Sequence, residues 1–100
     1  MPEKKRTITF AASAFDDLEG IRAWYQERQV PDVGNKLLGE IIFQMERLAD
    51  FPESGRIVPE FGIANLREII HPPFRIVDRL DGHKIRIIRI WRSEGLLKMP

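Results

Sequence analysis

The sequence predicts an α+β domain: an N-terminal strand, then an antiparallel helical hairpin packed on a four-stranded antiparallel sheet. Two observations carry this prediction. Apolar side chains recur at helical spacing in two adjacent segments between Ser13 and Asp50, and three segments rich in Ile and Val follow between Leu66 and Trp91. The predicted order is β-α-α-β-β-β, and a chain of 100 residues fits one domain, residues 1–100.

The first strand and the first helix follow each other closely. Thr7 to Ala11 alternates polar and apolar side chains, which is typical of a strand with one buried face. Ser13 is the predicted N-cap of a helix that runs to about Arg28, with Asp16 and Asp17 in its first turn, where acidic groups meet the positive end of the helix dipole. The apolar stripe of this helix consists of Ala14, Leu18, Ile21 and Tyr25.

The second helix is predicted from Pro31 to Asp50. Proline cannot continue the first helix, but it suits the first turn of the next one. Because the connection is very short, the two helices must lie antiparallel and bury their apolar stripes. The second stripe consists of Leu37, Leu38, Ile41, Ile42, Met45, Leu48 and Ala49.

Three strands are predicted after a loop that contains proline and glycine. They run over 66–70, 74–80 and 84–91, and the breaks between them fall at Pro72-Pro73 and Asp81-Gly82. Asp-Gly between two strand-like segments indicates a type I′ hairpin turn, because both central positions of that turn need positive φ. The three strands therefore form an antiparallel meander, into which the first strand pairs.

Composition limits the class of protein and its location. The chain has no cysteine, which excludes disulfides and cysteine-ligated zinc, and no apolar run long enough to span a membrane, so we expect a cytoplasmic protein. The first 55 residues hold seven Lys/Arg against ten Asp/Glu, and the rest hold nine against five. This asymmetry favours an anionic partner for the second half, either nucleic acid or an acidic protein surface, although a solvated sheet face explains it equally well.

The two histidines do not suggest a catalytic or metal site. His71 and His83 fall at opposite ends of the strand predicted over 74–80, so they cannot share a proton relay. No compact cluster of His, Asp and Glu has the spacing of metal ligands. We therefore predict neither a metal nor a cofactor.

The arginines of the predicted meander are the candidate binding residues. The guanidinium of Arg75 can hold a phosphate or a carboxylate with two hydrogen bonds, or it can form an internal ion pair with Glu60 or Glu68. On the last strand, alternation places Arg86 and Arg92 on one face and Arg89 and Trp91 on the other. An edge or face with Trp91 beside arginines can bind an added strand or an acidic helix, unless Trp91 simply caps the core.

Four motifs give the chain a resemblance to a known family. The segment Phe51–Phe61 resembles the P-x-x-G-R-x-V-P-E pattern that follows the helical hairpin in ParE-like toxins. Leu66-Arg67-Glu68 is similar to the family's L-R-E, Phe74–Val77 to the start of its Y-R-I-V-Y-R strand, and Asp17–Tyr25 to D-L-x-x-I-x-x-Y. The four motifs follow one another along nearly the whole chain in the order that is found in the family. Together they give the chain its resemblance to the RelE/ParE superfamily of bacterial toxins.

The resemblance implies the toxin of a type II toxin–antitoxin pair, of the kind that stabilises plasmids. Such a toxin inhibits growth and is neutralised by a cognate antitoxin, whose C-terminal segment wraps around it. Two target classes are found within the superfamily. RelE-like toxins cleave messenger RNA on the ribosome, whereas ParE-like toxins poison DNA gyrase.

The residues favour the ParE-like branch. RNA cleavage needs a proton acceptor, a proton donor and cations that hold the phosphate. The second strand of the sheet offers Arg67 beside the repelling carboxylate of Glu68, the segment 91–100 has neither His nor Tyr, and Tyr25 lies on the core stripe of its helix. We therefore expect a binder of DNA gyrase with no catalytic residue of its own.

Two alternatives remain open. One is a RelE-like endoribonuclease that acts on the ribosome; the other is an inactive relic that only binds its antitoxin. The residues expected to contact the target, or phosphate in the nuclease alternative, are Arg56, Arg67, Arg75 and Arg92. Those expected to bind the antitoxin are Arg86, Arg89 and Trp91. One departure from the family pattern is Asp78, which stands where ParE-like strands have tyrosine and which could weaken toxicity.

Overall fold

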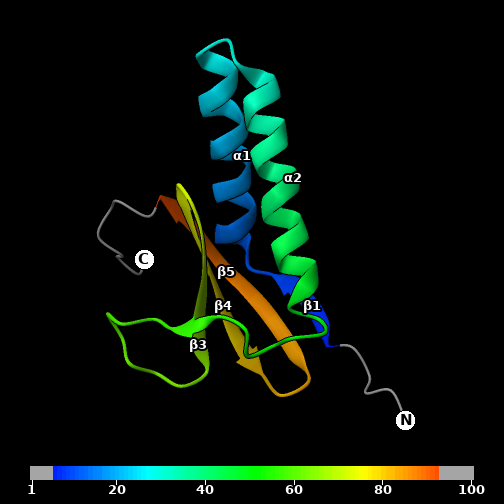
Figure 1. Cartoon of the computed structure of the whole chain (residues 1–100), viewed down its shortest axis with the longest axis vertical. Coiled ribbons are helices and arrows are strands. Elements are labelled where there is room, and N and C mark those ends of the chain that lie inside the picture. Colours follow the sequence, from blue (N-terminus) through cyan, green and yellow to red (C-terminus); the bar gives the residue numbers. More distant parts are fainter. Residues whose placement is uncertain (1–5, 93–100) are drawn as a thin grey trace.

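The structure, a computed structural model, describes residues 6–92 of the chain and forms two layers, a helical hairpin and a twisted sheet (Figure 1). The helices lie side by side and extend beyond the sheet. The C-terminal segment that lacks His and Tyr lies, from Ser93 onward, outside the described residues. The elements are β1 Thr7–Phe10, α1 Ala12–Glu27, α2 Pro31–Arg47, β2 Arg56–Ile57, β3 Leu66–His71, β4 Phe74–Asp81 and β5 Lys84–Arg92.

The α+β class and the helical hairpin are as predicted, but the sheet has five strands in the order β1-β5-β4-β3-β2, not four. The added strand β2 is only two residues long. The expectation of an all-antiparallel sheet is wrong as well, because β1 pairs with β5 in parallel. The reason lies in the number of chain reversals: β1 continues into α1, and reversals then follow at α2, β3, β4 and β5, so β5 runs in the same direction as β1.

The first helix of the hairpin begins differently from the prediction. Ala11 is the N-cap of α1, and the first turn holds no acidic residue. Ser13 is not the cap, since its hydroxyl donates to the carbonyl oxygen of Ile88 at 2.7 Å. The helix α2 starts at Pro31 as expected, and Gly34 lets the helices approach so closely that an added Cβ would lie 2.7 Å from Cβ of Tyr25.

The sheet has a helix face and an outer face. The larger apolar core fills the space between the helix face and the hairpin, and includes Ile41, Met45, Phe74, Ile76, Ile85, Ile87 and Ile90. A smaller cluster lies on the outer face, where Val58 from the loop before β3 packs on Leu66 and Val77. Thus the loop 58–65 covers part of the outer face, whereas Arg79, Lys84 and Arg86 on that face are exposed.

Two local features of the β4–β5 hairpin differ from the prediction. Asp81 pairs with Lys84, so the turn residues are Gly82 and His83, and of these only Gly82 has positive φ. This arrangement fits a type II′ turn with glycine first, not type I′.

The second feature is an irregularity in the pairing of β4 with β5 at Val77/Asp78. On β5 it inserts an extra residue between Ile87 and Arg89, which reverses the alternation of side chains. Arg86 therefore lies on the outer face, whereas Arg92 pairs with Phe74 on the helix face. The prediction that Arg86 and Arg92 share a face is wrong for this reason.

Candidate functional site

A closed network of four charged side chains occupies the outer face beside the smaller apolar cluster. The Arg75 guanidinium donates to Glu60 at 2.8 and 2.9 Å and through Nε to Glu68 at 2.7 Å. Arg56 Nε donates to the other oxygen of Glu68, also at 2.7 Å. Glu68 is only 1% exposed and Arg75 only 6% exposed. The internal ion pair, one of the two alternatives for Arg75, is therefore present, and it involves both glutamates.

The network shifts the ionisation of its members. Hydrogen bonds from Arg75 lower the pKa of Glu60 from 4.5 to about 2. The same contact with Glu60 raises the pKa of Arg75 further above its ordinary value. Two arginines balance two glutamates, so the network presents little net charge to a ligand.

The four residues predicted to contact the target or phosphate are not gathered in one place. Arg56 and Arg75 belong to the outer-face network. Arg67 lies on β3, where its guanidinium donates to the backbone oxygens of Ala64 and Gly55 at 3.1 and 3.2 Å. Arg92 lies over the rings of Trp24 and Phe74, with its Cζ 5.2 and 5.7 Å from their centroids.

Asp78 is the buried ionisable group that the network does not include. It is 0% exposed, and among the described residues neither carboxylate oxygen has a hydrogen-bond partner. It pairs with Arg67 on β3 and Ile87 on β5, so it lies on the helix face. Burial raises the pKa of Asp78 from 3.8 to about 7, and the charge of Arg67 opposes that rise only in part.

The strand β5 is longer than its neighbour β1, so within residues 6–92 its last part has no strand partner on that side. The pairing of β1 ends where Phe10 meets Ile87. Beyond that point, side chains of α1 bond to the strand edge: the Ser13 hydroxyl bonds to the Ile88 oxygen, and Asp17 accepts the Ile90 N–H at 2.8 Å. Asp17 also accepts two hydrogen bonds from Arg89, at 2.8 and 3.1 Å. These bonds fasten α1 to the bulged part of β5.

A groove of about 280 Å³ lies between α1 and this end of β5. We call it the β5-edge groove; it is lined by Asp16, Asp17, Gly20, Ile21, Trp24, Tyr25, Phe74, Ile90, Trp91 and Arg92. It holds both tryptophans of the chain, and Trp24 is 38% exposed. Aromatic side chains beside arginines are the composition that is enriched in the energetic centres of protein interfaces.

Arginines stack on the aromatic rings of the β5-edge groove. The Cζ of Arg28 lies 3.5 Å from the Trp24 ring centroid, and that of Arg89 lies 4.5 Å from the centroid of Trp91. The groove therefore combines apolar surface with arginines at its rim, beside the carboxylates of Asp16 and Asp17, the second of which is bonded to Arg89. Of the residues predicted to bind an antitoxin, the structure brings Arg89 and Trp91 together here, whereas Arg86 lies elsewhere on the outer face.

Trp91 also packs against the smaller outer-face cluster, so it both caps that cluster and lines the β5-edge groove. Sequence reasoning missed Trp24 and the role of Asp17. A signal for both was available, since Asp17, Gly20 and Trp24 follow one another at helical spacing beside the core stripe of α1.

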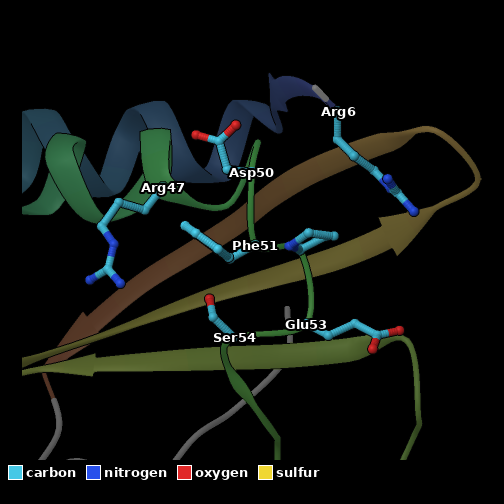
Figure 2. Close-up of a pocket in the computed structure, with 7 residues that line it drawn as sticks. Arg6, Arg47, Asp50, Phe51, Glu53 and Ser54 are labelled. Atoms are coloured by element: carbon cyan, nitrogen blue, oxygen red, sulfur yellow. The ribbon is translucent and has the colours of Figure 1, made fainter. Parts of the chain in front are cut away.

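A second hollow, of about 600 Å³, lies where the chain leaves α2 (Figure 2). In that view Phe51 lies between Arg47 and Arg6, and Ser54 follows on the loop below. Asp50 and Glu53 line the same hollow. With both signs of charge present, this hollow selects neither an anion nor a cation.

The two histidines lie far apart in the structure. His71 Nε2 forms a hydrogen bond with Glu40 of α2 at 2.8 Å, and His83 is exposed at the β4–β5 turn. Within residues 6–92 no three His, Cys, Asp or Glu side chains gather in a way that could hold a metal ion. In the same part of the chain, no helix has the length and hydropathy to cross a membrane.

The fold is shared with chains from three solved toxin–antitoxin systems. The structure is similar to the chromosomal ParDE toxin–antitoxin system from P. aeruginosa, with a TM-score of 0.76 and 25% identity over 90% of this chain and 98% of the other. The RelBE2 toxin–antitoxin complex from Mycobacterium tuberculosis gives a TM-score of 0.63 at 18% identity, with 88% and 98% of the chains covered. For the E. coli DinJ-YafQ complex the values are 0.57 and 15%, with 94% and 99% covered. At these lower identities the likeness concerns the fold alone.

The family follows from the sequence itself. The sequence model of the ParE toxin of the type II toxin–antitoxin system parDE matches residues 8–96. This chain therefore belongs to the ParE toxin family. No curated protein sequence matches it at a significant level.

Proposed function

We propose that the protein is a growth-inhibiting toxin that acts in the cytoplasm by binding DNA gyrase, and that a cognate antitoxin neutralises it by docking in the β5-edge groove. One observation carries most of this proposal. Three of the four arginines on which phosphate chemistry would depend, Arg56, Arg67 and Arg75, are bonded to other groups of the protein, while an apolar groove with arginines at its rim is open to a protein partner.

The closed network is a poor centre for RNA cleavage. A phosphate entering it would have to displace Glu60 from its two hydrogen bonds with Arg75, and it would then meet the buried carboxylate of Glu68. Stabilising charge that develops on a phosphate needs donors that are already free and oriented. In the network the guanidinium of Arg75 is already bonded to both glutamates, and the pKa of Glu60 is lowered to about 2, so Glu60 is a weak proton acceptor; both observations support binding over catalysis.

The β5-edge groove fits an amphipathic segment with acidic residues. Trp24 and Trp91 offer ring surface to an apolar anchor, while Arg28 and Arg92 at the rim suit carboxylates. Because Asp17 already satisfies the Ile90 N–H, a partner gains more here from packing than from adding a strand.

The proposal that gyrase is the target is tested by inducing the chain alone in a bacterial host. Growth, the DNA-damage response and bulk translation are followed in the same culture. Filamentation with a DNA-damage response and intact early translation supports the proposal. In parallel, purified toxin is expected to stabilise cleaved DNA in a supercoiling reaction with purified gyrase. A prompt translation stop with cut messenger RNA would instead establish the ribosome-dependent nuclease, and normal growth would indicate an inactive, antitoxin-binding relic.

The antitoxin site is tested with Trp24→Ala, whose side chain is partly exposed in the groove, against Phe43→Ala, which truncates a side chain 60% exposed on α2. Co-expression with the antitoxin encoded beside the toxin should rescue growth for wild type and Phe43→Ala. If Trp24→Ala is rescued equally and binds the antitoxin with unchanged affinity in calorimetry, the groove is not the docking site.

A further inference from the structure

Two exposed arginines on the outer face belong neither to the Arg75 network nor to the β5-edge groove. Arg79 on β4 and Arg86 on β5 pair directly across the two strands, and both are exposed. Like charges in directly opposite positions of a sheet repel each other and are destabilising. The contact of Arg79 with Asp81 is long, 3.9 Å, between side chains 46% and 69% exposed, so it offsets little of this repulsion.

Toward β1 and the β4–β5 turn, the neighbours of this pair are polar or charged, and they include Asp81, which pairs with Lys84. On the other side, Arg79 pairs with Leu66 of β3, which is 5% exposed. On β5, Lys84 precedes Arg86 on the same face, and on β1 the residues Thr9 and Thr7 pair with Arg86 and Lys84. We call Thr7, Thr9, Arg79, Lys84 and Arg86 the arginine patch. It combines cations with hydroxyl groups on adjacent strands, on the face away from the helical hairpin. Arg79, Lys84, Arg86 and Thr7 are exposed, whereas Thr9 is partly buried and its hydroxyl donates to the Ile85 oxygen at 3.5 Å.

We propose that the arginine patch binds the phosphate backbone of duplex DNA. Guanidinium, ammonium and hydroxyl groups are the donors that proteins present to phosphates. A peptide partner would need an apolar anchor, and the patch contains none. Single-stranded nucleic acid is bound on aromatic stacking platforms, and the patch has no aromatic side chain. A polar surface rich in cations fits instead the phosphate backbone of a duplex, which is bound without regard to base sequence.

This activity goes beyond gyrase binding, and it uses a different surface. The two tryptophans of the β5-edge groove are not part of the patch, and the patch cations are not part of the Arg75 network. A toxin with both surfaces can contact a DNA-bound enzyme and its DNA at the same time. DNA binding by the isolated chain is measured without gyrase or antitoxin, so the failure of one proposal leaves the other standing.

The test is the salt dependence of binding to a fluorescent duplex of about 20 base pairs, measured by anisotropy with the purified full chain. The variant is Arg79→Gln with Arg86→Gln. The matched control is Arg22→Gln with Arg47→Gln, which removes the same charge from exposed positions on α1 and α2. Circular dichroism verifies that both variants are folded.

Each lost phosphate contact lowers the slope of log affinity against log salt by about 0.9. We therefore expect the patch variant to have a slope about 2 smaller than wild type, so that raising salt from about 50 to about 200 mM weakens wild type about tenfold more. The control should keep the wild-type slope. The proposal is overturned by equal slopes for the patch variant and wild type, by an equal loss in the control, by absence of wild-type binding at low salt, or by tighter binding of single-stranded RNA of the same length.

Discussion

Asp78 makes the stability of this protein depend on pH in an unusual direction. The pKa of its carboxyl rises from 3.8 in the unfolded chain to about 7 in the folded one, because burial disfavours the charged form. The folded state therefore binds the proton more tightly, and stability is greatest below the unfolded pKa. It falls as pH rises through this window and is lowest above about 7, where the buried carboxylate is charged.

The size of the effect follows from the shift. Between about pH 5 and about pH 7 the unfolded carboxyl is ionised while the folded one is still protonated, and each pH unit there costs about 1.4 kcal/mol. We therefore expect Asp78 to lower the stability by about 3 kcal/mol between about pH 5 and about pH 8. The variant Asp78→Asn cannot ionise, so it should lose this dependence and exceed wild type at about pH 8 by roughly 2–3 kcal/mol.

Urea denaturation followed by circular dichroism at both pH values measures these differences. Glu27→Gln, which removes an exposed carboxylate from the end of α1, is the matched control and should keep the wild-type dependence. A wild-type pH dependence that survives unchanged in Asp78→Asn would refute the reasoning, as would a variant less stable than wild type at the higher pH.

Three further predictions concern other contacts. The lowered pKa of Glu60 means that its contribution to stability is present above pH 4.5 and is lost as pH falls toward about 2, so Glu60→Gln should unfold with a shallower acid dependence than wild type in a fluorescence titration. Asp17→Ala leaves the Ile90 N–H and Arg89 without their acceptor and should cost about 1–3 kcal/mol in urea denaturation, with partial recovery in Asp17→Asn; equal stability of the Ala variant and wild type would contradict this. Gly34→Ala places a Cβ 2.7 Å from Tyr25 Cβ and should cost about 1–3 kcal/mol, whereas Gly39→Ala on the same helix meets nothing within 4 Å and should stabilise by about 0.5–1 kcal/mol; thermal melts that rank the two variants in the opposite order would count against the close packing of the helices.

The helices and the meander could be predicted because their signals are local. Apolar spacing marks α1 and α2, and Pro31 marks the start of the second helix. The pairing of Arg75 with Glu60 and Glu68 was one of two alternatives, and only the fold could decide it, since the loop 58–65 brings Glu60 back over the sheet.

Other features depend on long-range geometry. The residues of β1 and β5 do not indicate that the two strands pair in parallel. Counting the chain reversals between them would have predicted it. The bulge on β5 does leave a trace in the sequence, because Ile85-Arg86-Ile87 is followed at once by Ile88-Arg89-Ile90, which breaks strict alternation. Reading that break would have separated Arg86 from Arg92 and indicated the open strand edge beside α1.

The pairing of β1 with β5 also determines at what point of its synthesis the protein can complete its sheet. The helical hairpin joins segments that are close in the chain, so it can form early. The strand β1 can pair only after β5 has been synthesised, because Thr7 pairs with Lys84. Ribosome-bound chains stalled before and after β5 should therefore differ sharply in their resistance to protease. A translation product that stops before β5 lacks both the β1–β5 pair and the strand edge beside α1. Such a product therefore has no β5-edge groove with which to bind a partner.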